Sequence, residues 1–269
     1  MIITPDLVFL NNPRTGTTFA RKAISAAYAS RVDPVSCGVR ELSLPIRRGH
    51  GQSGHDQHGT YVQIPARYRG LPVASAVRNP FTLLVAVYEL GLWRPSVLPT
   101  DPTGELDRHR PDAFEYFLRS QELAMAPRWG VPFGRSGFGP LSAHYLQMFA
   151  KAPLAAFRAV AQGADDDTVE GHIAPVQFVQ QERLAVDLCE LLKRLEADVD
   201  LEAIRHHPPS HVTRRSQVWT RDCFTAEMVD RIEQREAFLF RSLARRGIVY
   251  TFDNAVFTQP QRRSTAPAT

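Results

Sequence analysis

The chain has 269 residues, of which 43% are hydrophobic and 22% charged, with a formal net charge of +4 and a pI of about 9.1. This is the composition of a globular protein that buries a core without disulfides, which excludes disorder over most of the length. The basic excess is too small for typical nucleic-acid binding, the three cysteines form no disulfide framework or zinc spacing, and no apolar run reaches ~20 residues. We therefore expect a cytoplasmic protein with no nucleic-acid or membrane partner.

The first third of the chain predicts strands that alternate with helices. Residues 6–11 form a short apolar run typical of a buried strand, and a helical segment follows after Thr18. Residues 31–59 are rich in Gly, Ser, His and Arg and predict a loop. The next expected elements are a short strand at 60–64, a buried strand at 72–77 and a core helix that begins at Pro80.

The rest of the chain continues this alternation after an irregular insertion at 94–140, a possible lid that contains one helix at 112–121. The expected later elements are a helix at 141–150, a strand at 176–180, an amphipathic helix at 183–197, and a helix that Thr225 caps and Gly247 ends. Residues 1–257 thus predict a single α/β domain, with a parallel sheet of four or five strands flanked by helices. Residues 258–269 predict a disordered tail.

The loop at residues 13–18 (PRTGTT) joins the first expected strand to the first expected helix. A helix N-terminus after such a loop offers N–H donors and a positive dipole to a phosphate. Arg14 would carry charge, Gly16 would let the backbone approach the anion, and the threonines would add hydroxyl donors. The pattern GxxxxGK[ST] is absent, which disfavours hydrolysis of a magnesium nucleotide. A capped helix after a tight turn is the alternative interpretation.

This loop resembles the 5′-phosphosulfate loop, PKTGTT or PKTGGT, of sulfotransferases that use 3′-phosphoadenosine 5′-phosphosulfate (PAPS) as the donor. The resemblance implies a P-loop-like three-layer fold. The residues that it places on the 5′-phosphate are Thr15, Gly16, Thr17 and Thr18. Arg14 replaces the family's lysine and would neutralise charge on the bridging oxygen as sulfate leaves. Because a guanidinium is not a compact point charge, we expect this replacement to affect rate more than binding.

A second segment, ASAVRNPFTLLVAVYE at 74–89, resembles the family's 3′-phosphate segment, VRDPxxRxxSxYY. By this resemblance Arg78 lies at the carboxyl end of a strand and binds the 3′-phosphate through two nitrogens. A surface arginine before a helix-initiating proline is the alternative. Leu83 and Ala86 replace the family's Arg and Ser, so the 3′-phosphate loses a hydroxyl donor. Thr82 or a late arginine is expected to substitute.

Three histidines precede the second motif and are candidates for the base that accepts a proton from the acceptor hydroxyl. HGTYVQI, which begins at His58, resembles HVSYLDF in uronosyl 2-O-sulfotransferases, where the histidine starts a strand and acts as the base. His58 is therefore the first choice, followed by His55 and His50. Two alternatives remain open: these histidines bind a metal, or they are solvated loop residues.

The last third of the chain carries weaker similarity to the same family. Residues 176–195 resemble the family's late strand and helix, in which Glu182, Leu184 and Asp187 match residues of the scaffold. Residues 211–252 resemble its C-terminal segment, which places Arg214 and Arg215 near the nucleotide or the acceptor. An exposed basic loop is the alternative for these two arginines.

Together the patterns predict a PAPS-dependent sulfotransferase that acts on a hydroxyl of a carbohydrate or small molecule and needs no metal. A kinase and a catalytically silent nucleotide-binding protein of the same fold are the rival hypotheses. All of this depends on one geometric condition. Arg14 and Arg78 must lie close enough for a single nucleotide to contact both.

Overall fold

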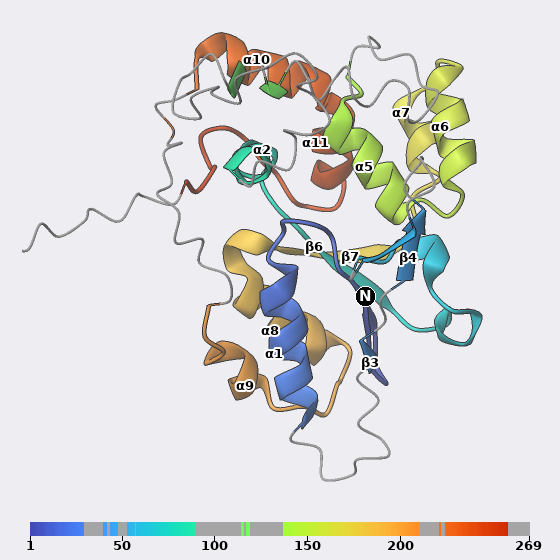
Figure 1. The fold of residues 1–269 in the computed structure, drawn as a ribbon, viewed down its shortest axis with the longest axis vertical. Coiled ribbons are helices and arrows are strands. Elements are labelled where there is room, and N and C mark those ends of the chain that lie inside the picture. Colours follow the sequence, from blue (N-terminus) through green and yellow to red (C-terminus); the bar gives the residue numbers. More distant parts are fainter. Residues whose placement is uncertain are drawn as a thin grey trace, which may run out of the picture.

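The structure is a computed structural model in which helices lie on both sides of a central sheet (Figure 1). It describes residues 1–29, 40–41, 44–47, 53–56, 58–89, 114–115, 117–118, 137–209, 221 and 224–257.

The sheet found among these residues has five strands in the order β3–β1–β2–β6–β7. Their bounds are Ile2–Ile3 (β1), Val8–Leu10 (β2), Arg40–Glu41 (β3), Val73–Val77 (β6) and Val176–Gln180 (β7). Strands β2, β6 and β7 are parallel, whereas β1 is antiparallel to both β2 and β3. The sheet is therefore mixed, and the prediction of a parallel sheet is confirmed for β2, β6 and β7 but not for β1. The few residues between β1 and β2 allow a hairpin but not the long crossover that a parallel pair needs.

Strands β1, β2 and β6 bury both of their faces, because neighbouring side chains point to opposite sides of a sheet and all residues of these strands are buried. Phe9, Ala74 and Val179 pack on one side against α1 (Thr17–Ala29), α8 (Leu184–Arg194) and α9 (Leu201–Arg205). Val8, Val73 and Val176 pack on the other, which is covered by α5 (Pro140–Phe149), α6 (Pro153–Ala161), α7 (Asp166–Glu170) and α11 (Ala237–Ala244). Figure 1 shows these two helix layers on opposite sides of β6 and β7.

A further apolar cluster joins α2 (Pro80–Glu89) to α10 (Ala226–Arg235). The sequence predicts one continuous helix from Thr225 to Gly247, and Thr225 does cap its start by accepting a hydrogen bond from the Met228 N–H at 3.2 Å. However, the helix breaks at Glu236 into α10 and α11. At this break, the Glu236 carboxylate accepts hydrogen bonds from the first turn of α5. The sequence around Glu236 does not predict these contacts.

The other expected elements had mixed outcomes. The strands at 72–77 and 176–180 are confirmed as β6 and β7, and the helices at 141–150 and 183–197 as α5 and α8. The expected loop at 31–59 instead contains β3 and a hairpin of β4 (Leu44–Arg47) and β5 (Ser53–Asp56). The expected strand at 60–64 is a 3-10 helix, η1 (Tyr61–Gln63). It is followed by η2 (Ala66–Tyr68), and η3 (Gln181–Arg183) leads into α8.

The 3-10 helix η1 forms because Thr60 and Gln63 make a local hydrogen-bonded cap. The Gln63 side-chain oxygen accepts from the Thr60 backbone N–H at 2.9 Å and from its hydroxyl at 3.1 Å. Such caps compete with strand pairing for the backbone groups. Within 94–140, the described residues 114–115 and 117–118 are helical, and Pro140 begins α5. Residues 137–139 of that insertion are described and lead into α5, whereas its other residues and the tail at 258–269 lie outside the described residues.

Candidate functional site

The two predicted phosphate motifs emerge side by side at the carboxyl ends of β2 and β6. The strands are parallel and in register, with Leu10 opposite Ser75, and the Ser75 hydroxyl donates to the Leu10 carbonyl at 2.8 Å. Beyond the strands, the Arg78 guanidinium Nη1 donates to the Arg14 carbonyl oxygen at 3.3 Å. The geometric condition that the sequence hypothesis imposes on Arg14 and Arg78 is therefore met.

The backbone of the first loop turns through two left-handed residues, Arg14 with φ 67° and Gly16 with φ 79°. A Cβ atom on Gly16 would lie 2.7 Å from Leu184 Cδ2 and 3.2 Å from Gln181 Cγ, so only glycine fits this position. The turn delivers the chain into α1 at Thr17. The helix thus begins three residues after Arg14, whose carbonyl Arg78 contacts, and its first N–H groups have no intrahelical partner.

The threonines of the first loop have different roles. The Thr15 side chain is fully buried, and its hydroxyl donates to the Asn12 carbonyl at 2.9 Å. This hydrogen bond stabilises the turn. Thr15 would therefore contact an anion through its backbone N–H. Thr17 is buried at the start of α1, and Thr18 is half-buried one residue further on. Arg14 is exposed and carries the charge of this loop.

The second loop, residues 78–79 between β6 and α2, carries Arg78, which is held in place by Thr82 in the first turn of α2. Arg78 Nε donates to the Thr82 hydroxyl at 3.0 Å, and this hydroxyl donates to the Asn79 carbonyl at 3.1 Å. The Thr82 hydrogen is thus already used within the protein. Thr82 therefore orients Arg78 in this structure, and its role as a substitute for the hydroxyl that Ala86 lacks stays a prediction.

Asn79 anchors the second loop to the C-terminal part of the chain. It is fully buried; its Oδ1 accepts from the Phe81 N–H at 3.0 Å, and its Nδ2 donates to the Thr251 carbonyl at 2.9 Å and to Asn254 Oδ1 at 3.1 Å. Its backbone N–H donates to Glu182 Oε1 at 2.9 Å. An aspartate, the residue in the motif that this segment resembles, has no N–H to make the two Nδ2 contacts.

Glu182 connects this loop to the chain after α11. Its second oxygen accepts a hydrogen bond from the Tyr250 hydroxyl at 3.0 Å. Burial, reinforced by the Glu182 carboxylate, raises the pKa of Tyr250 well above its ordinary value, so the hydroxyl stays a donor. Asp187 likewise accepts from the Gln180 N–H at 2.8 Å, where β7 ends. These contacts match the scaffold role expected of Glu182 and Asp187.

Two histidines contact the residues that precede the first loop. His58 Nδ1 lies 2.7 Å from the Asn11 carbonyl oxygen. Because a carbonyl only accepts, Nδ1 carries the hydrogen, and in the neutral ring Nε2 is then the proton acceptor. His58 precedes η1 and not a strand, which departs from the pattern that it resembles. The second histidine, His144 on α5, places Nε2 3.1 Å from Asn12 Oδ1.

No sequence pattern singles out His144, because it is a single histidine within a helical segment and belongs to no motif. Among the other predicted site residues, His55 lies in β5, and nothing is described of its side chain. His50, Arg214 and Arg215 lie outside the described residues. The contribution of the late basic loop therefore stays a prediction.

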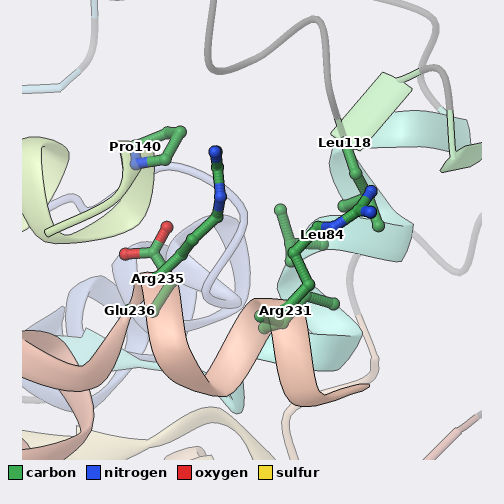
Figure 2. Close-up of a pocket in the computed structure, with 7 residues that line it drawn as sticks. Leu84, Leu118, Pro140, Arg231, Arg235 and Glu236 are labelled. Atoms are coloured by element: carbon green, nitrogen blue, oxygen red, sulfur yellow. The ribbon is translucent and has the colours of Figure 1, made fainter. Parts of the chain in front are cut away.

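A pocket elsewhere in the molecule lies between α2, α5 and α10 (Figure 2). Arg235 and Glu236 extend toward Pro140, and Arg231 lies near Leu84 and Leu118. Arg231 is paired with Glu115 at 3.6 Å and with Glu227 at 3.0 Å. Because these charges already have partners within the protein, we do not assign this pocket to an anion.

Across the described part of the chain, no His, Cys, Asp and Glu side chains gather in a group of three or more that would hold a metal ion. Within the same residues, no helix has both the length and the apolar character needed to cross a membrane. No protein-family model, curated protein or solved structure matches the chain. Any functional conclusion therefore rests on the residues and geometry of the site.

Proposed function

We propose that the protein is a PAPS-dependent sulfotransferase with a P-loop-like fold that acts on a hydroxyl of a carbohydrate or small molecule. The observation that carries the proposal is the hydrogen bond from Arg78 Nη1 to the Arg14 carbonyl. It joins two motifs that are 64 residues apart in the chain. Both resemble segments of one family, and both lie where open α/β sheets bind ligands.

The shape of the first loop supports an anion at its centre. Arg14 and Gly16 both have a left-handed backbone, and at Arg14 this is a strained conformation of the kind that persists at functional sites. The N-terminus of α1 and the Arg14 side chain would hold the 5′-phosphosulfate. Arg78, oriented by Thr82, would hold the 3′-phosphate.

PAPS, when bound, supplies the sulfuryl group, whose bond to the bridging oxygen breaks as the acceptor oxygen attacks in line. Arg14 would balance the negative charge that develops on that oxygen, together with the backbone N–H groups at the start of α1. His58, with its hydrogen fixed on Nδ1 by the Asn11 carbonyl, would accept the acceptor's proton on Nε2. Loss of a general base of this kind costs about 10²–10⁴ in rate.

The first experiment measures binding of adenosine 3′,5′-bisphosphate, the donor without its sulfate, by titration calorimetry. The protein should bind it more tightly than ATP. Arg78→Ala should weaken binding of the bisphosphate by about 10–100-fold, as expected for a charged hydrogen bond. The same change should barely alter the affinity for adenosine 5′-phosphosulfate, because that ligand lacks the 3′-phosphate. Arg194→Ala, an exposed arginine near the far end of α8, is the matched control. Equal losses for both ligands would contradict the assignment of Arg78.

The second experiment measures transfer of radiolabelled sulfate from PAPS to a panel of saccharide and phenolic hydroxyls. We expect transfer in the wild type and a loss of about 10²–10⁴ in His58→Ala. Donor binding without transfer to any acceptor would favour the silent binding protein. Magnesium-dependent turnover of ATP would favour a kinase.

A further inference from the structure

His144 contacts the residue before the first loop (residues 13–18) from a different layer of the fold. It lies on α5, and its Nε2 is 3.1 Å from Oδ1 of Asn12, the residue before Pro13. The orientation of the Asn12 amide is fixed, because its Nδ2 donates to the Ala76 carbonyl at 3.0 Å. Oδ1 therefore accepts, and His144 Nε2 is the donor.

Asn12 is the point where the loop is attached to its surroundings. It is 7% exposed, and its carbonyl accepts from the Thr15 hydroxyl at 2.9 Å, which closes the turn that contains Arg14. Its side chain ties this turn to β6 through Ala76 and to α5 through His144. A buried amide with all of these partners holds one orientation, because leaving one of its polar atoms unpaired costs free energy.

The helix that carries His144 is itself firmly placed. The buried Glu236 carboxylate accepts from the Leu141 N–H at 3.1 Å and from the Ser142 N–H and hydroxyl at 2.8 Å each. A Cβ on Gly139 would lie 2.2 Å from Glu236 Oε1, so the two segments are in close contact. His144 therefore donates from a rigid support, which a positioning residue needs.

We propose that His144 is a positioning residue that fixes the Asn12–Thr15 turn through the Asn12 side chain. This turn presents the Arg14 carbonyl that receives the Arg78 hydrogen bond. His144 thus acts on the geometry of the loop and not on the reacting atoms. Its effect on donor affinity rests on the proposed function, whereas its effect on loop order does not.

The decisive measurement is hydrogen–deuterium exchange of peptides covering residues 11–18, without ligand. His144→Leu, which removes the donor, should speed their exchange severalfold and leave peptides from α8 unchanged. His144→Gln, whose amide nitrogen has a similar reach, should restore the wild-type rate. If the leucine variant does not fold, His144→Asn replaces it. Its amide is too short to reach Asn12 Oδ1, so exchange at residues 11–18 should again be faster.

The same variants are then titrated with adenosine 3′,5′-bisphosphate. His144→Leu should weaken binding about tenfold, and His144→Gln should lie within about threefold of wild type. Unchanged exchange at 11–18, or a rise spread evenly through α8, would overturn the proposal. A wild type that does not bind this nucleotide would refute the proposed function instead, while the exchange data still decide the role of His144.

Discussion

The loops after β2 and β6 lie side by side, yet they are built in different ways. The first, from Pro13 to Thr18, depends on backbone shape, with two left-handed residues and a glycine that touches Leu184. The second depends on side-chain hydrogen bonds, in which Thr82 holds Arg78 and Asn79 reaches the chain after α11. One loop is suited to surrounding an anion with backbone groups, and the other to directing one cation.

The difference predicts different sensitivities. Added volume should damage the first loop, because its shape leaves no space at Gly16. The second should be damaged by changes of donor and acceptor even where volume is conserved, because Asn79 is fully buried with both ends of its amide in use.

Gly16→Ala should have the largest effect on stability. It combines a left-handed backbone, which costs about 1–2 kcal/mol for a residue with a Cβ, with overpacking against Leu184, which costs about 1–3 kcal/mol. We expect the free energy of unfolding, measured by urea denaturation, to fall by about 3 kcal/mol. Gly70→Ala is the control, because no atom lies within 4 Å of its Cβ position, and it should change stability by less than about 0.5 kcal/mol.

Asn79→Asp should come next, although the volume is conserved. The carboxylate loses both Nδ2 hydrogen bonds and faces the Thr251 carbonyl and Asn254 Oδ1, at a cost of about 2 kcal/mol. Urea denaturation measures this change. Asn254→Ala removes one of the two acceptors, so the cost of Asn79→Asp should be smaller in that background. Simple additivity of the two changes would show that the contact contributes little.

Thr82→Val should have a moderate effect on stability and a clear one on binding. It removes the oxygen that accepts from Arg78 Nε, so the free energy of unfolding should fall by about 1 kcal/mol and the affinity for adenosine 3′,5′-bisphosphate about tenfold. Calorimetric titration measures the affinity. Thr82→Ser keeps the hydroxyl and should bind as the wild type does. Equal affinities for the valine and serine variants would show that Thr82 does not orient Arg78.

Arg14→Gly should change stability least. Relief of the left-handed backbone, about 1–2 kcal/mol, is partly offset by the greater freedom of glycine in the unfolded chain, so the variant should be at least as stable as wild type. Its affinity for the bisphosphate should nevertheless fall at least tenfold. Arg14→Lys keeps the charge and should bind within a few-fold of wild type. A glycine variant that binds normally would remove Arg14 from the site.

Part of this architecture could be predicted from the sequence because its signals are local. The apolar runs of β2, β6 and β7 and the Pro, Gly and Thr residues after β2 are neighbours in the chain, and periodicity and turn chemistry reveal them. The parallel order of these strands brings their carboxyl ends to one edge. The adjacency of Arg14 and Arg78, which the sequence hypothesis requires, follows from this strand order.

Other features depend on partners far away in the chain. The break of the last helix at Glu236 depends on α5, because the first turn of α5 donates hydrogen bonds to the Glu236 carboxylate. Only the folded chain brings Asn12 to His144, 132 residues later, and commits the Thr82 hydroxyl to Arg78. The sequence by itself determined which residues are candidates for binding an anion. The tertiary structure decided which of them act as supports, because a hydrogen bond between distant residues leaves no periodic trace in the chain.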